Sequence, residues 1–151
     1  MTFVQLIDCK TSRFDEVDRL MDRWVEQTRG KRTATHDLVA ENYHDHDPSN
    51  EQDTMGMDQL RAVVGMWRGG FDMAFTVEDQ ISQGDRVATR WTWNATHTGD
   101  FMGIPAGGKK VAMTGTTTFR CRDDGKIAEA WWQYDRLGLM AQLGALDALE
   151  H

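Results

Sequence analysis

The hydrophobic pattern of this chain changes near residue 73 from a helical repeat to an alternating one. Before that point, apolar side chains recur at helical spacing, and after it apolar and polar residues alternate as they do in strands. Glycine-containing turn signals at 83–85 and 123–125 divide the alternating part into strands. Helices followed by an antiparallel meander predict an α+β fold in which the helices pack on one face of the sheet.

The same pattern predicts the individual elements. The polar segment 45–54 is expected to be a loop. The expected elements are an extra strand or an ordered arm at 2–9, helices at 12–30, 33–40 and 57–67, strands at 73–82, 86–98, 109–122 and 126–135, and a short helix at 136–143.

Size, charge and cysteine content restrict the class of protein. The chain of 151 residues is long enough to bury a core without disulfides, so residues 1–148 are expected to form a single domain. The formal net charge of -7 opposes contact with a phosphate backbone, so we expect no nucleic acid partner. Two cysteines, the lack of a secretory signal and the lack of a long apolar run predict a cytoplasmic protein without a membrane segment. Residues 149–151 resemble the remnant of an expression tag and carry no argument.

Several motifs in the chain together resemble the SnoaL-like polyketide cyclase family of the NTF2-like superfamily. The motifs are FTVED (75–79), GDRV (84–87), THTGDFMGIP (96–105), GKIAE (125–129), the segment from Trp131 to Leu139, and QLG (142–144). The resemblance implies a conical half-barrel, in which the N-terminal helices pack on a curved antiparallel sheet. It also implies an activity that in some members is an intramolecular aldol closure and in others assists hydroxylation, isomerisation, dehydration or epoxide hydrolysis.

Residues 1–9 depart from the helix with which this family usually starts. We interpret them as an added strand that takes part in dimerisation. An uncovered apolar sheet face is commonly buried by a second copy of the chain, so a homodimer is expected.

Asp135 is the predicted catalytic residue. The resemblance implies that the aspartate directly before the Leu-Gly-Leu segment is the family's acid/base. Alternation places Asp135 on the same face of the last strand as Trp131 and Gln133, and we expect this odd-numbered face to line the cavity. A carboxylate among apolar groups has a raised pKa, which suits a general base. In the alternative interpretation, Asp135 caps the helix that begins at Arg136.

His46 is the second predicted catalytic residue, since it occupies the place of a family histidine that precedes an acid and a proline. Imidazole titrates near neutral pH and can carry a proton, although a purely structural histidine is equally expected here. The run from His44 to Asp47 also resembles a metal site, but it needs another ligand from elsewhere, such as His97 or Asp135. We therefore expect no metal and no cofactor.

Aromatic residues supply the predicted substrate contacts. Trp93 and His97 share one face of the strand at 86–98, and Phe101 lies in the loop that follows. Flat rings offer a large contact area to a polycyclic ligand, but core packing or a dimer interface would use them equally well. The predicted substrate-binding residues are Trp93, His97, Phe101, Trp131 and Gln133.

These features favour an enzyme that performs acid/base chemistry of the aldol-cyclisation type on a carbonyl-rich, hydrophobic small molecule. One alternative is a small-molecule-binding or dimerisation module that has the same pocket but performs no reaction. Another is an isomerase, dehydratase or hydrolase that uses the same pocket, for which a second titratable group should lie close to Asp135.

Overall fold

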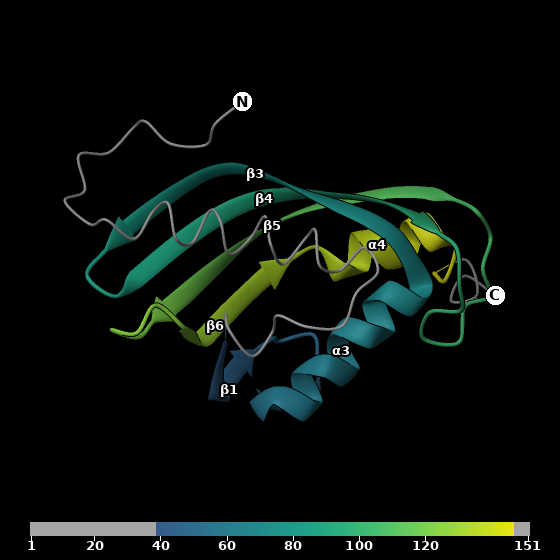
Figure 1. Ribbon diagram of the computed structural model, residues 1–151. Coiled ribbons are helices and arrows are strands. Elements are labelled where there is room, and N and C mark those ends of the chain that lie inside the picture. The colour runs from purple at the N-terminus through teal and green to yellow at the C-terminus, as the bar shows by residue number, and fades with distance from the viewer. Residues whose placement is uncertain (1–38, 147–151) are drawn as a thin grey trace.

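The computed structural model describes residues 39–146 of the chain, which form a curved sheet with helices on one side (Figure 1). The elements are β1 (Val39–His46), β2 (Thr54–Met55), α3 (Gly56–Gly70), β3 (Phe71–Gln83), β4 (Arg86–His97), β5 (Lys110–Cys121), β6 (Ile127–Tyr134) and α4 (Arg136–Leu143). The expectations for 2–9 and 12–30, and for most of 33–40, lie outside the described residues. No helix within the described range is long and apolar enough to cross a membrane.

The sheet has six strands in the order β2-β1-β6-β5-β4-β3. Strands β3 to β6 are consecutive antiparallel neighbours, which confirms the predicted meander, and each begins and ends within two residues of its predicted bounds. Gly84 and Gly125 adopt φ values of 60° and 80° in the turns, a conformation that glycine reaches without a steric penalty. The helix at 57–67 and the closing helix are also confirmed.

The prediction for residues 39–46 is wrong. The end of a helix and the start of a loop were expected, but this segment forms β1, which pairs in parallel with β6. The segment carries polar side chains on both faces, so it lacks the alternation of apolar and polar residues that marks a strand. Its pairing with a strand more than 80 residues away fixes the structure, and a local pattern does not report such a contact.

The sheet has an inner face, on which α3 and α4 lie, and an opposite outer face (Figure 1). Odd-numbered residues of β4 and β5 point to the inner face, where Trp91 and Trp93 are almost completely buried. In β6 the register reverses the parity, because Gly115 pairs with Tyr134 and Thr117 pairs with Trp132. The even-numbered face of β6 is therefore the inner one, and the prediction that its odd-numbered face lines the interior is wrong.

Two hydrophobic clusters fill the inner side of the sheet. One gathers around Tyr43, Leu60 and Phe119 between α3 and the β1 edge, and in the other Leu139 and Leu143 of α4 belong to the same cluster as Trp91 of β4. Trp132 packs against both clusters. The interior beside Trp132 therefore lies where the two clusters meet, and β1 contributes its inner-facing side chains there.

Candidate functional site

Asp45 is a buried carboxyl group on the inner face of β1, with 6% of its surface exposed. Burial raises its pKa from 3.8 to about 7, and the nearby negative charge of Asp47 acts in the same direction. Hydrogen bonding with Trp132 and Tyr43, and the charge of His46, lower this pKa and so offset part of the rise. Asp45 Oδ1 accepts no hydrogen bond from the described residues. The group can therefore be either protonated or ionised near neutral pH.

Tyr43 lies next to Asp45 on the same face of β1. Burial raises the pKa of its hydroxyl well above 10, and the charge of Asp45 raises it further. Tyr43 consequently keeps its proton over the whole physiological range and remains a hydrogen-bond donor.

The turn after β1 is held in place by side-chain hydrogen bonds. Tyr134 Oη donates to Asp47 Oδ2 over 2.7 Å, and Ser49 Oγ donates to Asp47 Oδ1 over 2.6 Å. Burial raises the pKa of Tyr134 to about 12, so it too remains a donor. Arg136 donates to Ser49 O and to Asn50 Oδ1, each over 3.3 Å. These contacts fix the position of the Asp47 carboxylate, whose negative charge raises the pKa of Asp45.

Three predicted substrate-binding residues meet on the inner face at the far end of the sheet. Trp93, His97 and Phe101 are all no more than 1% exposed. The ring of Phe71 lies between them, with its centroid 5.1 Å from that of Trp93, 5.2 Å from that of His97 and 4.8 Å from that of Phe101. Trp67 adds a contact with Phe101, at 4.8 Å between centroids. This arrangement is what the core-packing alternative expects, while the substrate-binding role of these three residues stays a prediction.

Asp135 is exposed at the N-terminus of α4 and acts as its cap. Its Oδ1 accepts a hydrogen bond of 2.7 Å from the backbone N–H of Gly138. This geometry is the capping alternative, while the catalytic role of Asp135 stays a prediction.

Trp131 and Gln133 lie on the outer face of β6, opposite the buried clusters. The Trp131 ring stacks on the ring of His46 at 5.1 Å, with an angle of 11° between the planes. The guanidinium of Arg86 lies 4.7 Å from the Trp131 ring centroid. Gln133 is exposed. The predicted substrate-binding residues are thus divided between the two faces of the sheet.

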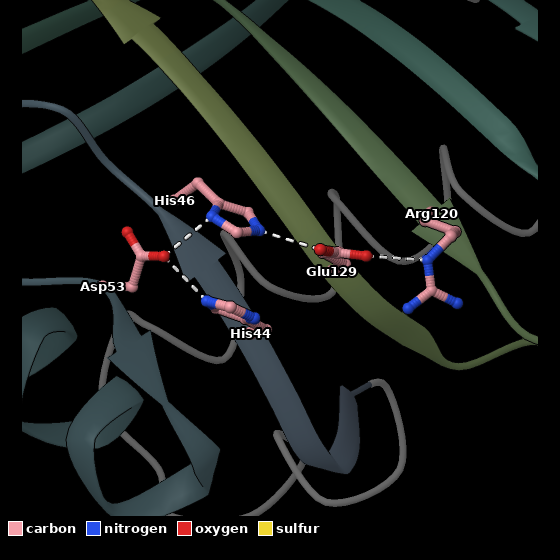
Figure 2. Close-up of polar contacts among 5 residues, drawn as sticks. All are labelled: His44, His46, Asp53, Arg120 and Glu129. Atoms are coloured by element: carbon pink, nitrogen blue, oxygen red, sulfur yellow. Dashed lines mark hydrogen bonds and ion pairs between the residues drawn. The ribbon is translucent and has the colours of Figure 1, made fainter.

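His46 belongs to a polar group that we call the outer-face cluster: His44, His46, Asp53, Arg120 and Glu129 (Figure 2). His46 Nε2 lies 2.8 Å from Glu129 Oε1, and His46 Nδ1 lies 2.9 Å from Asp53 Oδ2. His44 Nε2 lies 2.8 Å from the same Asp53 oxygen. Arg120 Nε donates to the other oxygen of Glu129 over 2.8 Å.

These contacts shift the titration of the cluster. Hydrogen bonding to Glu129 is the largest cause of a raised pKa at His46, and Asp53 also contributes. The same bond lowers the pKa of Glu129, with further help from Arg120. Bonding to His44 lowers the pKa of Asp53. The cluster therefore favours a charged imidazolium between two carboxylates.

Asp45, Tyr43 and Glu129 were not predicted from the sequence as residues of the functional site. Asp45 was considered only as a metal ligand beside the histidines, because the segment was expected to be a loop. In a strand, residues two apart share a face, so Tyr43 and Asp45 point inward while His44 and His46 point outward. Strand alternation was thus the signal that could have found the buried carboxyl.

The curved sheet and the helices on its inner face define an α+β protein of the NTF2-like class. A family model described as SnoaL-like polyketide cyclase matches residues 16–143. The chain belongs to the SnoaL-like polyketide cyclase family. No curated protein matches the sequence.

Several solved structures have a similar fold. A proposed SnoaL-like polyketide cyclase from Jannaschia sp. CCS1 is similar with a TM-score of 0.78 and 21% identity, over 92% of this chain and 99% of that one. IdmH from Streptomyces antibioticus, a proposed polyketide cyclase, has a TM-score of 0.69 and 29% identity, over 89% and 99% of the two chains. AclR from Streptomyces galilaeus, a proposed hydroxylase, has a TM-score of 0.72 and 23% identity, over 89% and 96%.

Proposed function

We propose that this protein is an enzyme that moves a proton on a carbonyl-rich, hydrophobic small molecule, with Asp45 as the proton carrier. The supporting observation is the burial of Asp45, which raises its pKa to about 7. A general base works best when its pKa lies near the working pH, because enough of it is ionised and it still binds a proton strongly.

The reaction that fits the family is an intramolecular aldol cyclisation. Ionised Asp45 removes a proton from a carbon flanked by two carbonyl groups, and the substrate spreads the resulting charge over both oxygens. The carbanion then attacks another carbonyl of the same molecule and forms a carbon–carbon bond. Protonated Asp45 returns its proton to the new alkoxide, so the group ends the cycle as it began.

Tyr43 has a supporting role in this proposal. Its raised pKa keeps the hydroxyl protonated beside Asp45, where it can donate a hydrogen bond to the carboxylate. Such a bond favours the ionised form of Asp45 and thereby limits the rise in its pKa. Removal of the hydroxyl should move the pH optimum upward rather than abolish turnover.

Asp135 is the competing proton carrier. It is exposed, and the Gly138 N–H occupies one of its oxygens. The variants Asp45→Asn and Asp135→Asn make the same chemical change, so a comparison of the two shows which carboxyl group transfers the proton. Asp124→Asn, in the exposed turn between β5 and β6, is the control for loss of one surface charge.

The experiment follows hydrogen–deuterium exchange, by NMR in deuterated buffer, at the carbon between the two carbonyls of an aromatic β-keto ester. This exchange measures the proton transfer itself, so the experiment does not need the natural substrate. We expect Asp45→Asn to slow catalysed exchange by at least about 100-fold and the other two variants to retain it. Loss of catalysed exchange in Asp135→Asn alone would show that Asp135 is the proton carrier. Equal exchange in all proteins would overturn acid/base catalysis by either group and leave a binding module.

The reaction type is also part of the proposal, because IdmH and AclR are described by different reactions and share this fold. The homodimer and the cytoplasmic location predicted from the sequence stay predictions. Light scattering coupled to size-exclusion chromatography tests the first of them.

A further inference from the structure

Two strands bring three metal-ligating side chains together on the outer face of the sheet (Figure 2). His44 and His46 are two residues apart on β1, so both point outward. Glu129 is the register partner of His44 in the parallel pairing of β1 with β6. One nitrogen from each histidine and one oxygen from Glu129 lie within 4.8 Å of one another.

This separation is close to what a transition-metal ion requires. Zinc binds imidazole nitrogen and carboxylate oxygen at about 2.0–2.2 Å in a tetrahedral arrangement, which places its ligand atoms about 3.4 Å apart. The largest separation in the cluster, 4.8 Å, exceeds this value by about 1.4 Å, so the side chains must move closer together by up to that amount when the ion binds. Two imidazoles and a carboxylate are also a ligand type that zinc accepts in proteins.

Two neighbouring residues complete the arrangement. Asp53 Oδ2 lies 2.8 Å from His44 Nε2 and 2.9 Å from His46 Nδ1, whereas Glu129 Oε1 faces the other nitrogen of His46, so Asp53 can orient the two rings without binding the same ion. Arg120 binds Glu129 Oε2 and leaves Oε1 directed at His46. A group that orients a ligating carboxylate in this way commonly increases metal affinity. With neutral imidazoles, two carboxylates and one guanidinium give the cluster a net negative charge, which favours a divalent cation.

We propose that His44, His46 and Glu129 bind a divalent transition-metal ion of the zinc type, with Asp53 orienting the two imidazoles. The ion would replace the proton that His46 Nε2 now shares with Glu129 Oε1, so binding releases a proton to solvent. It would join β1 to β6. Asp45 points to the opposite face of β1, so this site is separate from the proposed proton carrier and does not depend on it.

No metal was expected from the sequence, because no third ligand adjoins the histidines there. The candidates then considered do not reach the cluster: His97 is buried at the far end of β4, and Asp135 caps α4. In the sequence, Glu129 stands out only as part of the GKIAE motif (125–129). The parallel pairing, which a local pattern does not reveal, is what places it opposite His44.

The test is calorimetric titration of the full-length, chelator-treated protein with zinc sulfate. We expect saturable binding of about one ion per chain, weakened at least about tenfold by His44→Gln and by Glu129→Gln. Asp124→Asn is the matched control for loss of a distant acid and should bind within about twofold of the wild type. His36 and His151 are present in every variant, so binding at those histidines would persist in all of them.

A second measurement uses Co²⁺, whose visible absorption is intense in a tetrahedral site with protein ligands. The wild type should develop this absorption and His44→Gln should lose it. His44 is only partly buried, and its side chain hydrogen-bonds to Asp53 and packs against the His46 ring on the outer face, away from the buried clusters, so this variant should keep its far-ultraviolet circular dichroism. Absence of saturable zinc binding in the wild type, or equal binding by all variants, would overturn the proposal. Loss of zinc binding with normal exchange activity would leave the proposed function intact.

Discussion

Glu129 Oε1 lies 2.8 Å from His46 Nε2, and the two residues are 83 positions apart in the sequence. They meet because β1 joins the sheet in parallel beside β6, at the edge of an otherwise antiparallel meander. The contact therefore links the first and the last described strands of the chain. Its strength should depend on pH, because both partners titrate.

The coupling between His46 and Glu129 should be largest between about pH 5 and pH 6.5. The raised pKa of His46 stabilises the folded protein fully below the ordinary value of 6.5, and this contribution is lost as pH rises through the folded pKa. The lowered pKa of Glu129 contributes above its ordinary value of 4.5, and is lost as pH falls through the folded pKa. A double-mutant cycle with His46→Gln and Glu129→Gln, measured by urea unfolding, gives the coupling. A coupling that stays constant from pH 5 to pH 9 would contradict this assignment.

Asp45→Asn should stabilise the protein at pH 8 and have little effect at pH 4. The folded pKa of Asp45 is raised above its unfolded value, so the folded state holds a proton that the unfolded state releases. Stability is therefore lost as pH rises from about 4 to about 7, by up to about 4 kcal/mol for a shift of this size. Chemical unfolding of both proteins at the two pH values measures the difference. Equal pH dependence in wild type and variant would show that another group carries the effect.

Gly115→Ala should lower the free energy of unfolding by about 1–3 kcal/mol. A Cβ at this position would lie 2.5 Å from the Trp91 ring and 2.7 Å from the backbone oxygen of Gln133, and neither can retreat easily. Gly65→Ala is the matched control, since nothing lies within 4 Å of its Cβ position in α3. That variant should gain about 0.5–1 kcal/mol, because alanine favours a helix interior. Thermal unfolding of the two variants beside the wild type distinguishes them by sign.

Asp135→Ala should destabilise the protein by about 1 kcal/mol, the usual cost of losing an N-cap. Asp135→Ser retains an oxygen that can accept the Gly138 N–H and should recover most of this loss. Urea unfolding measures both. If the serine variant is as unstable as the alanine variant, the hydrogen bond to Gly138 does not carry the stability of this helix start.

The elements from α3 onward could be predicted because their signals are local. The turn before Arg86 contains a glycine with positive φ, and Asp135 is a residue type that caps helices. β1 could not be predicted in the same way, because its residues are polar on both faces and only its partner strand determines their conformation.

The site was predicted in part for the same reason. His46 was identified from its residue type and position, whereas its bond to Glu129 depends on the order of strands in the sheet. The parity of β6 was assigned incorrectly because alternation defines two faces without saying which one is buried. The pairing of Thr117 with Trp132 decides that question, and it also moves Trp131 and Gln133 to the outer side.

The pairing of β1 with β6 is irregular between Val39 and His44. Beyond that irregularity, Asp45 pairs with Ala130 and points inward. A one-residue deletion at Glu41 or Asn42 that shifted the strand would exchange its two faces, placing imidazoles inside and the carboxyl of Asp45 in water. The folded protein would then have the imidazoles of His44 and His46 in its interior and the Asp45 carboxyl on its surface. The irregular pairing between Val39 and His44 therefore determines whether a carboxyl group or imidazole groups face a molecule bound on the inner side.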